Sequence, residues 1–201
     1  MKKESNLKLF TVSLVMLGCS IGFASCSKDD DKTKEPTSDA VYGEYAGKMY
    51  VTAISPQMAA AADDPQTSGL DINATVKSDT VFFEDFPVQM IVASMVPAEM
   101  LDAIMGAIGK VQYKIGYKAA LNETKDGFVL EADPKPLELT IPLSATEIQF
   151  VKVTVSATDK GDYSVGNKNL KFSIKANSVT VNETPLPGFS ELPFSFDLNK
   201  K

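Results

Sequence analysis

The sequence predicts an all-β fold, either an antiparallel sandwich or a barrel of many short strands, with one helix near residues 97–109. Two observations carry this prediction. Apolar and polar residues alternate along several stretches, as they do in strands with one buried and one solvated face. Turn-forming residues separate these stretches at intervals of roughly 8–12 residues, a spacing typical of sandwiches and barrels.

The predicted strands follow one another along most of the chain. The clearest alternation covers residues 45–53, 111–118, 137–144, 151–156 and 170–175. The dipeptide Asp126-Gly127 predicts a hairpin between two strand-like runs, and residues 159–162 and 176–178 predict further turns. Pro142 cannot donate a ladder hydrogen bond, so it is predicted at a sheet edge or at a bulge.

One segment has a helical pattern instead. In "VPAEMLDAIMGAIGK", residues 96–110, Pro97 suits the first turn, Glu99 suits the positive N-terminal end and Gly109 suits the exit. The apolar residues of this segment fall on one broad face. The helix is therefore predicted to lie against the β body or to plug its end.

The chain starts with the pattern of a secretory signal peptide. Lys2, Lys3 and Lys8 precede an apolar run that continues with interruptions to Phe23, and small residues follow it. A retained transmembrane helix needs about 20 apolar residues and a stop-transfer flank. Removal of this segment is therefore predicted.

The residues after the apolar run are similar to a bacterial lipobox. In such a motif a cysteine thiol is acylated and the chain is cut directly before it, and Ala24-Ser25-Cys26 has this form. Cys26 is the predicted lipidation site; Cys19 is the alternative site, and secretion with a free Cys26 is a second alternative. The predicted organisation is a signal peptide at 1–25, a lipidated cysteine and polar tether at 26–40, and one mostly β domain at 41–201.

The sequence of the tether predicts where in the cell the protein is located. Directly after Cys26, "SKDDD" resembles the acidic tag of Bacteroidales lipoproteins that are exported to the outer leaflet of the outer membrane. This resemblance implies a lipid-anchored protein exposed at the cell surface, with the periplasmic leaflet as the alternative. A polar tether of this length has a root-mean-square reach of roughly 20 Å, which would hold the domain clear of the head groups.

The charge balance excludes several partners. Removal of residues 1–25 takes away three Lys and one Glu, which leaves 17 Lys against 25 Asp plus Glu and a net charge near −8. Nucleic acids and anionic head groups attract basic surfaces, so neither is an expected partner. Membrane contact is predicted through the acyl anchor alone.

The absence of several residue types excludes some classes of catalytic and metal-binding site. The chain has no His, no Arg and no Trp, and with Cys19 cleaved away and Cys26 acylated no thiol remains. Histidine-based triads and ordinary zinc sites are excluded, and no metal or other cofactor is expected. The protein is predicted not to be an enzyme; a hydrolase that uses two carboxylates is the remaining catalytic alternative.

Candidate ligand-binding residues lie near the helix. Tyr113 and Tyr117 share one face of a predicted strand, where they are either core aromatics or, with Met100 and Met105, the lining of a small internal cavity. The methionines recur every five residues from position 90, a spacing that does not align them on a helix. Residues 90–95 are predicted to be extended. Core packing or an adaptable apolar groove is therefore favoured over a copper site.

Family resemblance rests on three stretches. The lipobox with "SKDDD", the segment "YGEYAGKMYVT" and the end "FSFDLNKK" together resemble an uncharacterised family of Bacteroidales lipoproteins, known as a domain of unknown function. The pattern Y-x-G-x-M-x-V is similar to the first strand of calycin-like barrels, which makes such a barrel one form of the predicted fold. Asp79-Thr80-Val81 resembles the O-glycosylation acceptor of Bacteroidales, which implies glycosylation at Thr80.

We therefore expect a non-catalytic binding or interaction module on the outer membrane. Its expected partner is another surface protein or an extracellular polymer, and its oligomeric state is left open. A calycin-like carrier of a small apolar ligand is the first alternative, and the carboxylate-dependent hydrolase is the second.

Overall fold

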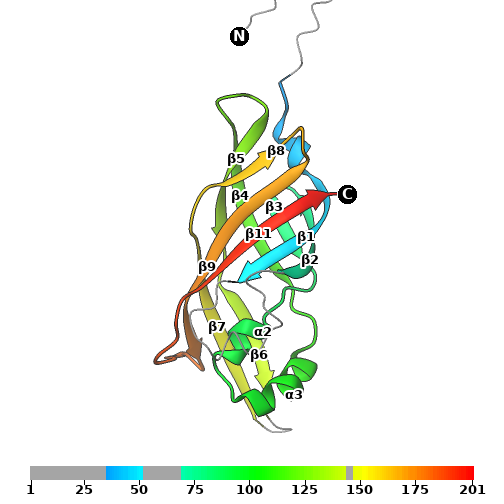
Figure 1. Cartoon of the computed structure of the whole chain (residues 1–201). Helices are drawn as coiled ribbons and strands as arrows, with labels where there is room; N and C mark the ends of the chain where they lie inside the picture. Colours follow the sequence, from blue (N-terminus) through cyan, green and yellow to red (C-terminus); the bar gives the residue numbers. More distant parts are fainter. Residues whose placement is uncertain (1–34, 52–68, 144–146) are drawn as a thin grey trace, which may run out of the picture. The chain divides into compact units, whose positions relative to one another are not determined.

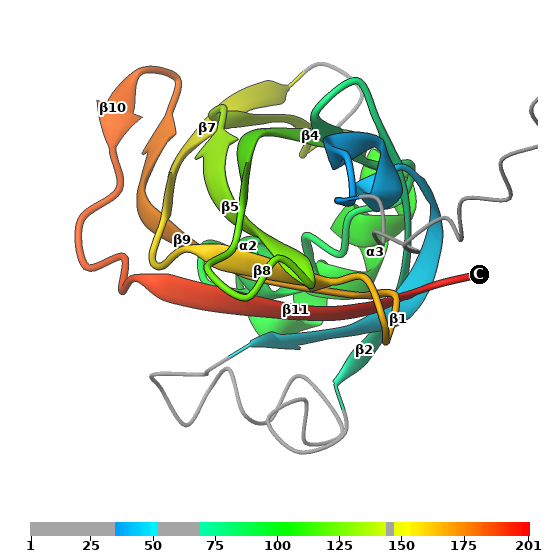
Figure 2. The same cartoon turned by 90° about the horizontal axis from the view of Figure 1, so that it is seen from above.

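Eight strands close into an antiparallel barrel in the computed structural model, which describes residues 35–51, 69–143 and 147–201. Figure 1 shows these strands from the side, and Figure 2 shows the ring that they form. In ladder order they are β1 (Gly43–Val51), β2 (Leu70–Lys77), β3 (Thr80–Phe83), β4 (Tyr113–Leu121), β5 (Gly127–Pro134), β8 (Gly161–Ser164), β9 (Asn169–Val181) and β11 (Leu192–Lys200). Pairing of β11 with both β9 and β1 closes the barrel.

The structure thus confirms the all-β prediction, and of the two predicted architectures it has the barrel. Each barrel strand pairs antiparallel with the barrel strand that follows it in the chain. This up-and-down order is consistent with a calycin-like barrel.

Three more strands extend the sheet beyond one end of the barrel. They are β6 (Leu137–Pro142), β7 (Ile148–Ala157) and β10 (Thr184–Pro185). Strand β9 has 13 residues, and its first part pairs with β8 while the remainder pairs with β7, which in turn pairs with β6. We call β6, β7, β10 and the second half of β9 the extension sheet.

Helices cover both ends of the β structure. The 3₁₀ helix η1 (Ser38–Val41) lies at one end of the barrel, and α2 (Gln89–Ala93) and α3 (Ala98–Ile108) lie at the other, where α3 contacts β6 (Figure 1). Helix α3 confirms the predicted helix. Among the described residues, no helix is long and apolar enough to span a bilayer.

The expectation of an extended segment at residues 90–95 was wrong, because α2 covers most of it. Met90, Ile91 and Val92 are all buried at 2% exposure or less, so three consecutive apolar residues pack on different sides of a short helix. A helix that is apolar all round has no amphipathic period, and its sequence resembles that of a buried strand.

The predicted turns had different outcomes. Asp126-Gly127 does end a hairpin loop between β4 and β5, where the Asn122 side-chain oxygen accepts hydrogen bonds from both backbone N–H groups at 3.1 and 3.2 Å. Residues 176–178 lie inside β9, so that predicted turn was wrong. Asn177 stands there because its amide donates to the Ser156 hydroxyl at 3.0 Å beside the bulge in β7. Pro142 is the last residue of β6, an end strand of the sheet, as predicted.

Residues 35–201 form one compact unit, which includes residues 35–40 of the predicted tether. Val41 is fully buried, and the Lys125 ammonium lies 2.5 Å from the Glu35 carboxylate. Lys200 also donates to the Ala40 carbonyl at 2.9 Å. These contacts hold the last part of the predicted tether on the barrel, whereas Cys26 and the predicted signal peptide lie outside the described residues.

Candidate functional site

Aromatic side chains fill the middle of the barrel. Phe83, Phe86, Phe172, Phe194 and Phe196 form one cluster, in which the rings of Phe172 and Phe196 stack with centroids 4.5 Å apart. All five are at most 6% exposed. Burial of each such ring contributes about 1.5–3 kcal/mol to folding. The cluster is therefore the core of the domain.

Tyr113 belongs to this core. Its ring meets that of Phe86 edge to face with centroids 5.0 Å apart, and its hydroxyl donates to the Lys135 carbonyl at 2.7 Å. Burial raises the pKa of Tyr113 above its ordinary value of 10.0. As predicted, Tyr117 lies on the same face of β4, and it is only 7% exposed.

Tyr117 differs in its hydroxyl, which is buried and has no hydrogen-bond partner among the described residues. It lies towards the η1 end of the barrel. There the Tyr45 hydroxyl donates to the Val41 carbonyl at 2.5 Å and also shares a hydrogen bond with Tyr163. Burial is the main cause that raises the pKa values of Tyr45, Tyr117 and Tyr163. The hydrogen bond from Tyr45 to Val41 fastens η1 to the barrel.

The two methionines predicted to line a cavity lie on α3. Met100 is 41% exposed on α3, and Met105 is half-buried on the same helix. Helix α3 contacts β6 of the extension sheet, outside the ring of barrel strands. The structure therefore brings Tyr113 and Tyr117 together on one strand but does not bring Met100 to them.

Thr80, the predicted glycosylation site, begins β3 and is half-buried. Its hydroxyl donates to the Ser78 carbonyl at 3.2 Å. The neighbouring Asp79 accepts a hydrogen bond from the Tyr42 hydroxyl at 2.9 Å, which raises the pKa of Tyr42. Glycosylation of Thr80 stays a prediction.

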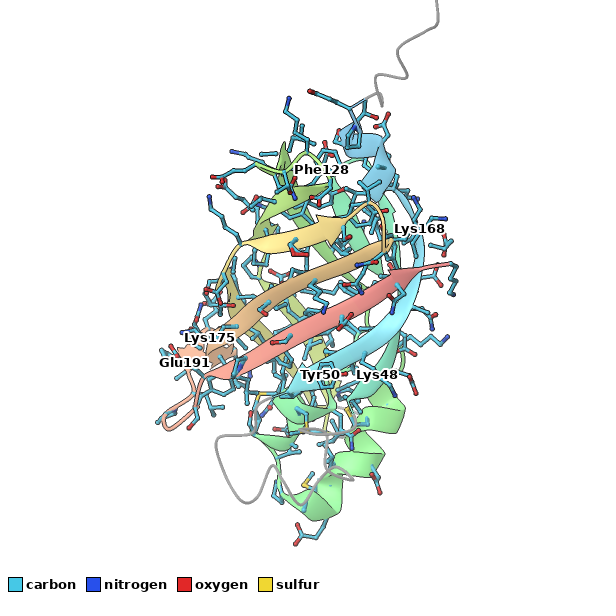
Figure 3. All side chains as sticks on the ribbon, turned by 45° about the horizontal axis from the view of Figure 1, so that its top comes forward. Lys48, Tyr50, Phe128, Lys168, Lys175 and Glu191 are labelled. Atoms are coloured by element: carbon cyan, nitrogen blue, oxygen red, sulfur yellow. The ribbon has the colours of Figure 1, made fainter. Side chains whose placement is uncertain are left out.

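Paired charges cover the outer wall of the barrel. Asp162 faces Lys171, Lys171 faces Asp197, Asp197 faces Lys48 and Lys48 faces Asp71, each on the next strand from β8 to β2. The ion pairs Lys48–Asp71 and Lys171–Asp197 measure 2.8 and 3.2 Å. Figure 3 labels Lys48 on β1 at this wall. We call this row of alternating charges the charge ladder; four of its five members form these two ion pairs.

The outer face of the extension sheet is different in kind. Phe150 is 65% exposed and Ile148 is 52% exposed, both on β7. Phe150 is flanked in register by Thr140 on β6, and the next row along the strands contains Glu138, Lys152 and Thr180. A groove of about 890 Å³ runs across these rows; its lining includes Glu138, Thr140, Phe150, Lys152, Thr180, Asn182 and Glu183. We call these side chains, with Ile148, the extension face.

Backbone contacts fix Phe150 in place. Its N–H donates to the Asn182 side-chain oxygen at 2.9 Å, and its carbonyl accepts from the Asn182 N–H at 2.8 Å. Asn182 and Glu183 have positive φ values of 48° and 67°, which form the tight turn from β9 to β10. The turn thereby carries the amide group of Asn182 beside the exposed phenyl ring.

The charged groups of the extension face are unpaired. Within the described ranges, Glu138, Lys152 and Glu183 take part in no ion pair, whereas the charge ladder contains two. In the same ranges, no group of three or more acidic side chains is arranged to hold a metal ion. The extension face thus combines an exposed ring with free polar groups, an arrangement suited to binding.

Sequence reasoning missed this face although a signal was present. Ile148 and Phe150 alternate out of phase with Val151 and Val153 on the same strand. Because the valines face the core, the earlier pair must point to solvent. Two neighbouring apolar residues that point to solvent do not contribute to the core, so they indicate a surface with another role.

Comparison with protein families gives one match. Residues 40–181 match the model of a domain of unknown function, DUF4840. The chain belongs to this family. The matched region runs from the end of η1 through β9. It includes seven of the eight barrel strands and the β6 and β7 part of the extension face, but not Asn182, Glu183 or β11, and DUF4840 as described assigns no activity. Searches of curated proteins and of solved structures found no significant match.

Proposed function

We propose that the protein is a non-catalytic interaction module that is anchored to the outer membrane through Cys26 and binds its partner with the extension face. The observation that carries the proposal is the exposed Phe150, which stands on a hydrogen-bonded sheet among charged groups that form no ion pair within the described ranges. Neighbouring exposed apolar groups rimmed by polar residues mark binding sites, and Phe150 lies two residues from the exposed Ile148 on β7.

The barrel itself supports a role as a scaffold. Its interior holds the phenylalanine cluster, which leaves Tyr113 as a core residue and favours an interaction module over a carrier of an apolar ligand. Four of the five members of the charge ladder are already ion-paired, so binding there would have to break existing ion pairs. Binding to the extension face would break no ion pair among the described residues.

The arrangement of the body suits display from a tether. Glu35 and η1 lie at one end of the barrel, and β6, β7 and α3 lie at the other (Figure 1). A lipidated chain that enters the barrel at Glu35 would leave the extension face at the end remote from the attachment. We propose display on the outer leaflet, as the "SKDDD" tag implies, with the periplasmic leaflet as the alternative.

Site-specific photo-cross-linking on intact cells tests the proposal. A photoreactive amino acid is placed at Thr140 on the extension face or at Ser195 on the barrel wall, both of which are exposed positions. We expect a light-dependent, high-mass adduct from position 140 and none from position 195. Adducts from position 195 alone, or from neither position, would contradict the assignment of the extension face.

A further inference from the structure

We infer that the extension face binds a neutral oligosaccharide chain, with the phenyl ring of Phe150 as the platform for one sugar ring. This inference rests on the proposed function and names the chemical class of the partner. It would make the groove across β6, β7 and β9 a series of sugar subsites.

The exposed ring of Phe150 can act as a stacking platform for a sugar. The C–H groups on one face of a pyranose ring carry partial positive charge, and the face of an aromatic ring is negative. Phe150 is 65% exposed, so its ring is open to contact. Its N–H donates to the Asn182 side-chain oxygen and its carbonyl accepts from the Asn182 N–H, so binding requires no reordering of the backbone that carries the ring.

Polar groups on both sides of the ring could bind the hydroxyls of a stacked sugar. Thr140 flanks Phe150 on β6, and Asn182 flanks it at the end of β9. Adjacent strands lie roughly 4.8 Å apart, so these groups stand where the hydroxyls of a stacked sugar would project. The Asn182 oxygen already accepts a hydrogen bond from the backbone, which leaves its NH₂ group to donate, while the Thr140 hydroxyl both donates and accepts.

The next row of residues along the strands provides further hydrogen-bonding groups. Glu138, Lys152 and Thr180 lie in register across the three strands, and Glu183 also lines the groove. Carboxylates accept hydrogen bonds from sugar hydroxyls, and an ammonium group donates to hydroxyl or ring oxygens. Two carboxylates against one ammonium leave the groove net negative, so a neutral glycan suits it better than an acidic one.

The proportion of apolar to polar side chains in the groove favours a glycan over a protein as the partner. A stable protein interface buries a contiguous apolar centre inside a polar rim. In this groove a single exposed ring is surrounded by polar side chains, with Ile148 beyond the groove lining. The groove volume of about 890 Å³ exceeds the room that one sugar ring needs, which favours a chain of several sugars.

Affinity gel electrophoresis tests the inference. The full-length protein, purified in a neutral detergent, is run in native gels that contain a soluble β-glucan, a xylan or a galactomannan, and in one that contains polygalacturonic acid. We expect retardation in at least one neutral gel and none in the acidic gel. Phe150→Ala should weaken that retardation at least tenfold, and Asn182→Ala should weaken it several-fold.

A matched variant controls for general effects. Phe82→Ala removes another outward-facing phenylalanine, which lies on β3 of the barrel wall between Lys77 and Lys114. We expect this variant to be retarded like the unaltered protein. Circular dichroism of all three variants checks that each is folded.

Three results would overturn the inference: no retardation in any neutral gel, retardation in the acidic gel alone, or equal retardation of Phe150→Ala and the unaltered protein. The proposed function can fail separately. If a discrete protein is cross-linked at position 140 while no polysaccharide retards the chain, the interaction module stands and the glycan inference fails. If neither occurs, both fail.

Discussion

Tyr113 and Tyr117 enter the barrel from the same face of β4. In the part of the chain that the structure describes, the Tyr113 hydroxyl has an acceptor, the Lys135 carbonyl at 2.7 Å, and the Tyr117 hydroxyl has none. A buried hydroxyl without a partner has lost its water and gained nothing in exchange. It therefore lowers stability by about 1–3 kcal/mol relative to a satisfied group. Tyr113 and Tyr117 can therefore be compared directly, because both are buried on the same strand and differ in whether the hydroxyl has an acceptor.

We expect the two phenylalanine substitutions to act in opposite directions. Tyr117→Phe removes the unpaired hydroxyl and should raise the free energy of unfolding by about 1 kcal/mol. Tyr113→Phe leaves the Lys135 carbonyl without its donor and should lower that free energy by about 1 kcal/mol. Urea unfolding followed by circular dichroism measures both. Equal destabilisation by the two changes would show that Tyr117 has an acceptor.

Stability should fall in alkaline solution. The pKa values of Tyr45, Tyr113 and Tyr117 are raised above 10.0 by burial, so the folded protein keeps these hydroxyls protonated where the unfolded chain ionises. The stabilisation is complete below the unfolded pKa near 10.0 and is lost progressively as pH rises above it. Urea midpoints between pH 8 and about 11.5 should be flat at first and then decline. Tyr113→Phe should reduce the slope of the decline, and an unchanged slope would contradict this account.

Barrel closure depends on the absence of a side chain at Gly47. This residue pairs with Leu198 where β1 meets β11, and a Cβ there would lie 2.0 Å from the Asp197 carbonyl oxygen. Gly47→Ala must displace backbone, and we expect it to lower the free energy of unfolding by about 3 kcal/mol or more. Gly106→Ala on α3 is the control, because nothing lies within 4 Å of its added Cβ. It should stabilise by up to about 1 kcal/mol through helix propensity.

The charge ladder should respond to salt. Asp197 faces both Lys48 and Lys171 across the strands, and it pairs with Lys171 at 3.2 Å. Asp197→Asn leaves the two lysines facing one neutral group, and we expect a loss of roughly 0.5–1 kcal/mol at low ionic strength. The loss should shrink in 1 M NaCl because salt screens exposed charges. Asp133→Asn removes an acid that pairs with Lys135 alone and should cost less.

Lipidation at Cys26 predicts the behaviour of the chain in detergent. We expect the protein to enter the detergent phase on Triton X-114 partitioning, and Cys26→Ser to move it to the aqueous phase because the acyl chains are lost. Cys19→Ser should leave the partitioning unchanged. The reverse pattern would identify Cys19 as the modified residue, and aqueous partitioning of the unaltered protein would contradict lipidation.

Alternation along the chain predicted much of the fold. The valines at 151 and 153 and the tyrosines at 113 and 117 point inward, as their phase requires. The choice between sandwich and barrel depended on whether β11 pairs with β1 as well as with β9, which is a long-range pairing that local pattern does not encode.

At two places tertiary contacts override the local sequence pattern, which made the prediction from sequence wrong. The segment around Met90 is helical because tertiary packing buries it on every side, so the period that identifies a surface helix is absent. Residues 176–178 look like a turn because Asn177 is a turn former, yet its side chain is used at a bulge in the neighbouring strand. The extension face was missed because Ile148 was not compared in phase with the valines that follow it.

Strand β9 gives the binding surface and the scaffold a single backbone. Its 13 residues run from the barrel wall, where Lys171 pairs with Asp197, into the extension sheet, where Val181 pairs with Val151. No linker separates the two parts, so the extension cannot swing as a lid does. Amide hydrogen exchange should therefore be slow along the whole strand, and the two parts should exchange as one cooperative unit that offers its partner a preformed surface.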